Sequence, residues 1–196
     1  MATEERITII GGGSIGMSIA LGMVKSGKYH ASQFIITRKK SDLPKDLKKY
    51  GFTFTADNLS AVKKSNMIIL AVLPMNAKSI LSEIKTALNS KKIIISIVTG
   101  LVIKDIENLI GNKIPIFRAM PNTAIKIRES MTCVAHNDVA SSKAEKVVEM
   151  FDLLGKTLVI EEDLMASATA LCSCGIAFFL RSIRAASQGG TQIGFH

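Results

Sequence analysis

Short apolar runs alternate with longer amphipathic stretches along the first 160 residues of the chain. The runs are nearly continuous, which is typical of strands that helices cover on both faces. We expect strands at residues 7–10, 34–37, 67–72, 93–98, 116–118, 131–135 and 157–160, and helices at 14–26, 76–88, 102–110 and 141–154. This alternation predicts an α/β fold with a doubly wound, mainly parallel sheet. In such a fold, ligands bind outside the carboxyl ends of the strands.

The pattern changes after the acidic residues 161–163. Residues 164–180 carry no charge, and their number reaches the lower limit for a membrane-spanning helix. Small polar residues interrupt this stretch, so we expect a buried helix and no membrane partner. A helix that is apolar on all sides needs neighbours on every side. Because only residues 181–196 follow, we expect a chain that is cut short or a helix covered by a partner subunit, with Phe178, Phe179 and Ile183 driving association.

The first apolar run ends directly in a glycine turn. Gly11, Gly13 and Gly16 have the spacing G-x-G-x-x-G, after an expected strand and before an expected helix. In a dinucleotide-binding turn, the first glycine allows the tight bend, the second lets the backbone approach a pyrophosphate, and the third allows close packing of the helix. The helix that begins near Ser14 would direct its free N–H groups at the phosphates. A plain strand–turn–helix connection can use the same glycines, but the flanking elements favour a dinucleotide.

The end of the second expected strand is basic. Many NAD-binding folds place an acid there, about 20 residues after the glycines, to hold the ribose hydroxyl. This chain has Thr37, Arg38, Lys39 and Lys40 instead, and no carboxylate before Asp42. A hydroxyl with two kinds of cation suits a 2′-phosphate, although a solvated basic turn would have the same composition. We therefore predict NADP(H) as cofactor, with NAD(H) possible.

Composition and charge narrow the remaining function classes. Hydrophobic residues make up 47% and charged residues 21% of the chain, as in ordinary globular proteins. The net charge is +9, but the lysines are scattered and there is no tryptophan, so we do not expect a nucleic-acid partner. The polar N-terminal residues resemble no signal peptide, which predicts a cytoplasmic protein. Cys133 stands alone in an expected strand, Cys172 and Cys174 point apart on a helix, and we expect no metal site.

Seven segments together resemble the delta-1-pyrroline-5-carboxylate reductase family, the enzymes of the last step of proline biosynthesis. In chain order they are IIGGGSIG at 9–16, ADN at 56–58, AVLP at 71–74, SIVTG at 96–100, RAMPNT at 118–123, EEDLM at 161–165 and TALCSCGIAF at 169–178. The resemblance implies a Rossmann domain at residues 1–160. It also implies that residues 161–196 begin an all-helical substrate and dimerisation domain, which forms a homodimer or larger assembly.

The resemblance further implies an oxidoreductase that reduces pyrroline-5-carboxylate to L-proline with NADPH, and it assigns roles to residues of this chain. The residues matched to cofactor binding are Gly11, Gly12, Gly13, Ser14, Ile15, Gly16, Thr37, Arg38, Asn58, Ala71, Val72, Leu73, Pro74, Ile97, Val98 and Thr99. Those matched to the surroundings of the substrate are Met120, Pro121, Asn122 and Gly175. Thr169 is a candidate for a hydrogen bond to the imine nitrogen, or it packs only its methyl group.

Three positions depart from the family's motifs. Leu73 replaces a lysine, Ala124 replaces a proline, and SCGI at residues 173–176 replaces GSGP beside the expected substrate pocket. Two alternatives therefore stay open: a non-catalytic NADP-binding regulatory relative, and a reductase of another small imine. Imine reduction requires mainly orientation of two bound molecules, because a protonated imine is already electrophilic. The absence of an acid–base dyad from the sequence thus fits an imine better than a carbonyl substrate, which needs a proton donor.

Overall fold

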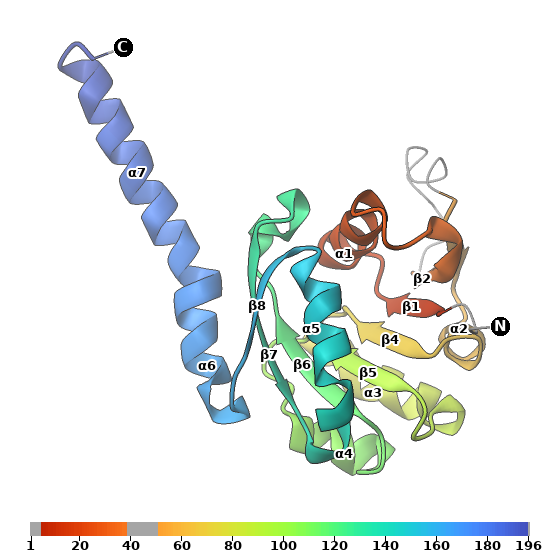
Figure 1. The fold of residues 1–196 in the computed structure, drawn as a ribbon. Helices are drawn as coiled ribbons and strands as arrows, with labels where there is room; N and C mark the ends of the chain where they lie inside the picture. Colours follow the sequence, from red (N-terminus) through yellow and green to blue (C-terminus); the bar gives the residue numbers. More distant parts are fainter. Residues whose placement is uncertain (1–4, 39–50, 196) are drawn as a thin grey trace.

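The structure, a computed structural model, describes residues 5–38 and 51–195 (Figure 1). Lys39 and Lys40, which we predicted to lie at the cofactor phosphate, fall outside this range. Within it, eight strands form one sheet in the order β3-β2-β1-β4-β5-β6-β7-β8. Their bounds are β1 Ile7–Ile10, β2 Phe34–Thr37, β3 Thr53–Thr55, β4 Met67–Leu70, β5 Ile93–Ser96, β6 Ile116–Met120, β7 Ser130–His136 and β8 Gly155–Val159.

The sheet confirms the expected doubly wound topology. All neighbouring strands are parallel except β6 and β7, which are antiparallel. The chain runs outward from β1 through β2 to β3 and then returns to the other side of β1 as β4. The point where the strand order reverses lies between β1 and β4. A ligand crevice is expected there, at the carboxyl ends.

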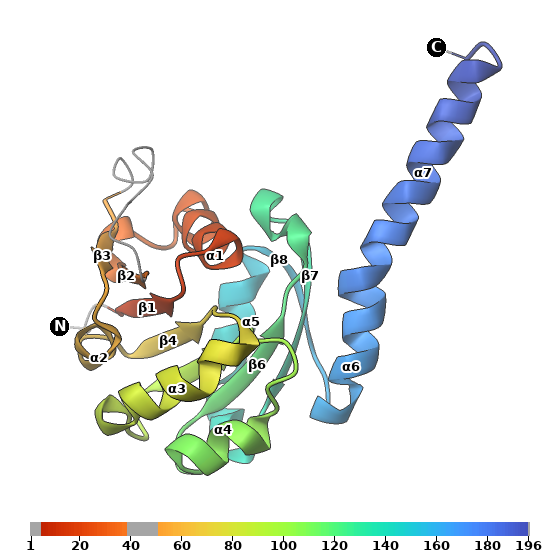
Figure 2. The ribbon, with the colours of Figure 1, turned by 180° about the vertical axis from the view of Figure 1, so that it is seen from behind.

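Helices cover both faces of the sheet (Figures 1 and 2). On one face α1 (Ser14–Lys25) and α5 (Ala144–Asp152) pack on a core that includes Ile9 and Phe117. On the other, α2 (Asn58–Lys63), α3 (Pro74–Ile84) and α4 (Ile103–Ile110) pack on a core that includes Ile68. Short 3-10 turns lie at Ala31–Gln33, Lys85–Ala87, Thr123–Ile127, Asp138–Lys143 and Glu162–Leu164. Because both faces are covered, the central strands are buried along their whole length, which explains their continuous apolar runs.

Some elements differ from the sequence expectations. The strand β3 and the helix α2 were not predicted, because three and six residues are too few to show a clear period. The helix expected at 141–154 begins only at Ala144, after a 3-10 turn. The expected strands at 67–72 and 93–98 end two residues early, at Leu70 and Ser96, where the chain turns into the crevice.

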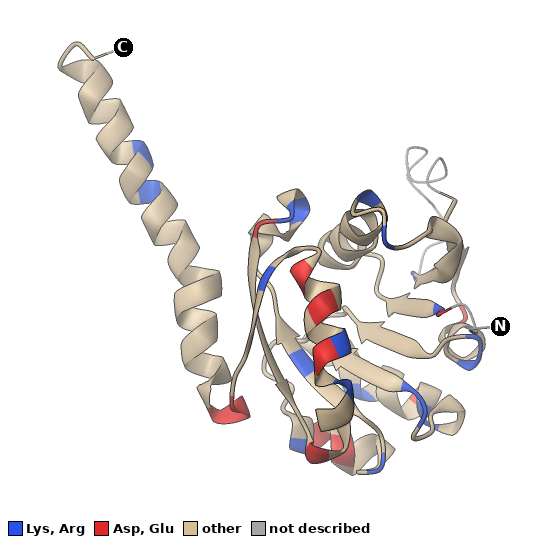
Figure 3. Cartoon of the chain, viewed as in Figure 1, with Lys and Arg blue, Asp and Glu red and all other residues tan. Residues whose placement is uncertain are grey.

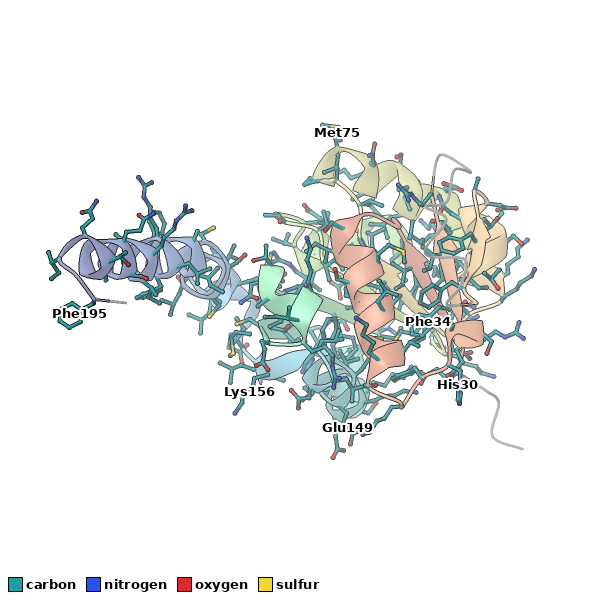
Figure 4. The ribbon with its side chains drawn as sticks, turned by 90° about the horizontal axis from the view of Figure 1, so that it is seen from above. His30, Phe34, Met75, Glu149, Lys156 and Phe195 are labelled. Atoms are coloured by element: carbon teal, nitrogen blue, oxygen red, sulfur yellow. The ribbon has the colours of Figure 1, made fainter. Side chains whose placement is uncertain are left out.

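The C-terminal residues form a helical arm that projects from the sheet (Figures 1 and 2). It consists of α6 (Met165–Ala168), a π-helical turn (Thr169–Cys174) and α7 (Gly175–Gln192). No residue of α7 is buried, and Phe178, for example, is 72% exposed. In Figure 4 side chains extend from both edges of this helix without meeting another element. The expectation of a buried helix is therefore wrong for this chain, because composition does not specify which neighbour covers an apolar helix.

The arm also has few charges. Its basic residues, Arg181 and Arg184, lie near the middle of α7, and the acidic residues 161–163 precede it at its base next to the sheet (Figure 3). By length and composition alone, the helical stretch Glu162–Gln192 would be able to cross a membrane. The same composition suits a helix that is covered by other helices.

Candidate functional site

In the glycine turn after β1, the backbone lies very close to that of the neighbouring strand end. Gly11 has a φ of +106°, and a Cβ there would collide with the carbonyl oxygen of Ala71. The N–H groups of Gly11 and Gly12 donate to the carbonyl of Thr37 over 3.2 and 2.9 Å, which ties the turn to the end of β2. A Cβ on Gly13, in contrast, would meet no protein atom within 4 Å. The space above Gly13 is thus open for a ligand.

The N-terminus of α1 faces the same space. The helix has Gly13 as its N-cap, no side-chain cap and no acid in its first turn. Its first N–H groups lack partners within the helix, and the helix dipole makes this end positive. The turn therefore suits an anionic group, as we expected of a pyrophosphate site.

The first part of the crevice is a cavity of about 350 Å³ between β1, β2 and α3. Thr37 is buried there, and its hydroxyl donates to Oδ1 of Asn58 over 2.7 Å. The amide of Asn58 in turn donates to Oε2 of Glu83 over 3.1 Å. Arg38 adds a cation to the lining, and within the described residues it takes part in no ion pair. The buried Thr37 thus orients Asn58, while Arg38 supplies the positive charge.

Three polar residues of α3 that we did not predict also line this cavity: Asn76, Ser79 and Glu83. In the sequence they look like the solvated face of an amphipathic helix. The spacing of Asn76, Ser79 and Glu83, three and four residues apart, places them on one face, but only the fold shows that this face borders the crevice.

A second cavity, of about 430 Å³, continues the crevice along the carboxyl ends of the strands. It shares Ala71, Val72 and Leu73 with the first cavity, so the two cavities adjoin and together form the crevice. The other lining residues are Gly13, Ser14, Ile15, Ile97, Thr99, Met120, Pro121, Asn122, Thr123 and Ser173. The structure therefore brings together the glycine turn, three further strand ends and the arm.

Several predicted site residues lie beside the crevice without lining its two cavities. Gly12 packs under the stem of Arg38, and Gly16 packs against the carbonyl of Gly11. Pro74 begins α3, and Val98 is buried in the core on the α3 and α4 face. Gly175 begins α7 on the arm, three residues after Cys172, whose backbone carbonyl accepts a hydrogen bond from Asn122 in the loop after β6.

A third cavity, of about 670 Å³, lies where the arm leaves the sheet. It borders the crevice through Thr99 and Met120, which line both cavities. Thr169 also lines it, and its hydroxyl donates to the carbonyl of Met165 over 2.7 Å. Since that proton is engaged, the oxygen of Thr169 can serve a ligand only as an acceptor.

The loop after β6 is held in place by Asn122, which is 5% exposed. Its Oδ1 accepts from the N–H of Ala124 over 3.0 Å, and its own N–H donates to the hydroxyl of Ser130 over 3.1 Å. A proline at position 124 would lack the N–H group for this bond. The departure at Ala124 therefore adds a hydrogen bond to the loop.

The cysteines are arranged differently from our expectation. Cys133 on β7 is buried and does not stand alone, because its thiol lies against that of Cys172 on the arm. Burial, reinforced by Cys172, raises the pKa of Cys133 to about 11. Cys174 is exposed. In the described part of the chain, no group of three or more His, Cys, Asp or Glu side chains is arranged to bind a metal.

Comparison with known proteins points to one family. Residues 6–100 match the family described as NADP oxidoreductase, coenzyme F420-dependent. The chain is 41% identical to pyrroline-5-carboxylate reductase 2 of Dictyostelium discoideum, and the aligned region covers 100% of this chain and 71% of the relative. It is 39% identical to pyrroline-5-carboxylate reductase 1 of the same organism, covering 98% of this chain but 37% of that relative.

Solved structures agree with these relatives. The pyrroline carboxylate reductase of Plasmodium falciparum with NADP bound has a TM-score of 0.85 at 26% identity, covering 98% of this chain and 71% of that one. The pyrroline-5-carboxylate reductase of Coxiella burnetii has a TM-score of 0.90 at 25% identity, covering 99% of this chain and 73% of that one. The chain thus belongs to the pyrroline-5-carboxylate reductase family.

Proposed function

We propose that the protein reduces 1-pyrroline-5-carboxylate to L-proline with NADPH, the last step of proline biosynthesis. The observation that carries this proposal is the crevice of two adjoining cavities, which begins at the cationic Arg38, crosses the glycine turn and ends between Asn122 and the arm. It has the order of parts that a nicotinamide dinucleotide requires: a cation for the ribose phosphate, free N–H groups for the pyrophosphate, and a walled end for the reacting ring.

The residues of the crevice fit NADP(H), with NAD(H) as a weaker alternative. The open space over Gly13 and the uncapped N-terminus of α1 suit the pyrophosphate. Arg38 would hold the 2′-phosphate, with Asn58 beside it. The segments Ala71–Pro74 and Ile97–Thr99 would flank the middle of the cofactor. When bound, NADPH supplies the hydride that reduces the C=N bond.

The residues around the substrate would mainly orient it and exclude water. Met120, Pro121 and Asn122 form one wall, and the arm with Thr169 and Gly175 would form the other. A protonated imine nitrogen carries an N–H group, and the hydroxyl oxygen of Thr169 is able to accept from it because its own proton goes to Met165. This role requires no acid–base dyad, because the substrate is already electrophilic.

We further propose that residues 1–160 form the cofactor domain and that 161–196 belong to a helical domain through which subunits form a dimer or a larger assembly. The exposed apolar side chains of α7 support this, because an uncovered surface of this kind is typical of a protein interface. A cytoplasmic location stays a prediction.

The test is an assay of the full-length protein with pyrroline-5-carboxylate and, in parallel, NADPH and NADH. We expect substrate-dependent oxidation of NADPH that is faster than that of NADH, and chromatographic detection of proline. Tight NADPH binding without turnover would favour the non-catalytic alternative, which the altered residues 173–176 motivate. Turnover restricted to a different cyclic imine would change the substrate and keep the reaction.

A further inference from the structure

At the base of the arm, one carboxylate joins three elements. Oε1 of Glu162 accepts a hydrogen bond from Nη1 of Arg118 over 2.8 Å. The same oxygen accepts from the backbone N–H of Ile103, also over 2.8 Å. Arg118 lies on β6, Ile103 is the first residue of α4, and Glu162 begins the turn that leads into the arm.

The side chain of Arg118 carries a charge although it is buried in the fold. Among residues 5–38 and 51–195 it is the one charged residue that is buried, with 7% of its surface exposed. A buried guanidinium needs a partner, because an unpaired charge inside a protein is strongly unfavourable. Glu162 provides it from 44 residues away in the chain. The orientation of the turn at Glu162 is thus fixed by a group inside the sheet.

The bond to Ile103 fixes a second element. Helix α4 has Val102 as its N-cap, and no side chain of its own caps it. Glu162 supplies the missing acceptor across 59 residues. Helix α4 follows the segment of Thr99 and Gly100, which lines the cavity at the base of the arm. One oxygen therefore sets the arm relative to both β6 and the loop after β5.

Arg118 and Glu162 line the cavity of about 670 Å³, which Met120 and Thr169 line as well. Met120 is two residues beyond Arg118 on the same strand, and Thr169 is two turns beyond Glu162 along the arm. A change at Glu162 would therefore shift Thr169 relative to the loop after β6. Misplacement by about 1 Å is enough to reduce turnover roughly a hundredfold in enzymes that act by orientation.

We infer that Glu162 is a positioning residue: its carboxylate, held by Arg118 and Ile103, sets the arm and its Thr169 against the cofactor-side loops. The inference rests on the proposed imine reduction for its kinetic meaning. It predicts that the loss of Glu162 affects turnover and leaves cofactor binding intact, because neither Arg38 nor the glycine turn lines the cavity that Glu162 borders.

The experiment compares Glu162→Ala with the control Glu161→Gln, which changes an exposed neighbour. In Glu162→Ala we expect kcat for pyrroline-5-carboxylate to fall roughly 10- to 100-fold, while the Kd of NADPH stays within about twofold of the wild-type value. The control should match the wild type in both. Two results would overturn the inference: a kcat of Glu162→Ala equal to that of the wild type, or a loss of NADPH affinity as large as the loss of kcat.

A second variant separates positioning from stability. Arg118→Met combined with Glu162→Ala removes the buried charge that Glu162→Ala leaves unpaired, so the double variant should unfold at a higher denaturant concentration than the single one. We expect its kcat to stay low, because the arm is still not anchored. Recovery of kcat together with stability would mean that Glu162 acts only by pairing a charge.

A third readout does not depend on catalysis. The amide hydrogen of Ile103 should exchange faster in Glu162→Ala than in the wild type, since its acceptor is removed. If the wild-type protein does not reduce pyrroline-5-carboxylate, the proposed function fails, but faster exchange at Ile103 and along α6 still supports the anchoring. Unchanged exchange at both places contradicts it, whatever the activity.

Discussion

The side-chain amide of Asn122 donates a hydrogen bond of 2.9 Å to the backbone carbonyl of Cys172. This bond joins the loop after β6 to the π-helical turn of the arm, across 50 residues of the chain. A π-helical turn interrupts the regular ladder of backbone bonds, which leaves a carbonyl for an outside donor, and such turns are frequent at functional sites. Asn122 thus connects the two walls of the proposed substrate site.

Replacing Asn122 by aspartate tests this connection. The change keeps the shape and the bond from Ala124 but turns the donor toward Cys172 into an acceptor, so two oxygens face each other. We expect the free energy of unfolding to fall by about 1–3 kcal/mol and turnover to fall with it. Urea denaturation measures the first effect, with the exposed Asn112→Asp as control. An unchanged denaturation midpoint would show that the bond contributes little.

The glycine turn gives a prediction that separates stability from binding. Gly11→Ala should destabilise the fold by about 2 kcal/mol or more, because the position has a positive φ and no room for a Cβ. Gly13→Ala should fold normally, because its Cβ meets open space, but should raise the Kd of NADPH roughly tenfold, about 1.4 kcal/mol. Thermal unfolding and NADPH titration of both variants measure these effects.

The control for both glycine variants is Gly189→Ala, in the last turn of α7, where an added Cβ also meets no other atom within 4 Å. It should stabilise the helix slightly and leave NADPH binding unchanged. If Gly13→Ala bound NADPH as tightly as this control does, the pyrophosphate would not lie over the turn.

Much of the sheet can be predicted from the sequence, and the reason is physical. Strands buried on both faces must be apolar throughout, so β1 and β2 are visible as Ile7–Ile10 and Phe34–Thr37 with their observed bounds. The edge strand β3 has one face open and only three residues, so it shows no such run. The antiparallel pairing of β6 with β7 follows from the short connection between them, which is too short for a crossover helix.

The predicted site residues were found from strand ends and motifs, and those that were missed come from tertiary contacts. Glu83 looks like a solvated helix residue until α3 is placed beside the crevice. The pairing of Arg118 with Glu162, and the approach of Cys133 to Cys172, join residues about 40 positions apart. No local pattern encodes such contacts. The composition of α7 likewise does not predict that this helix is exposed.

Cofactor preference should depend on Arg38. Its guanidinium lines the cavity next to Asn58 and has no ion-pair partner in the described residues. Arg38→Ala should weaken NADPH binding roughly 10- to 100-fold, because hydrogen bonds to charged groups contribute about 1.5–3 kcal/mol. NADH, which lacks the 2′-phosphate, should bind with nearly unchanged affinity. Equal weakening for both cofactors would place the phosphate elsewhere.

The proposed role of Thr169 is tested by two substitutions. Thr169→Ser keeps the hydroxyl and its bond to Met165 and should retain most of the activity. Thr169→Val keeps the shape without the oxygen and should lower kcat roughly tenfold, the effect of about one hydrogen bond. NADPH affinity should be the same in both variants. Unchanged turnover in Thr169→Val would show that the hydroxyl of Thr169 has no role in the reaction and that the side chain only packs.

The thiol of Cys133 should make stability depend on pH in the alkaline range. Burial, and then the neighbouring Cys172, raises its pKa from 9.0 to about 11 in the folded protein. Since the folded pKa lies above the unfolded one, the contribution to stability is complete below pH 9 and is lost as the pH rises towards 11. The melting temperature of the wild type should therefore fall more steeply over this interval than that of Cys133→Ala.

At pH 8, iodoacetamide should modify the exposed Cys174 and spare Cys133. Rapid modification of Cys133 would show that its thiol is not buried in solution.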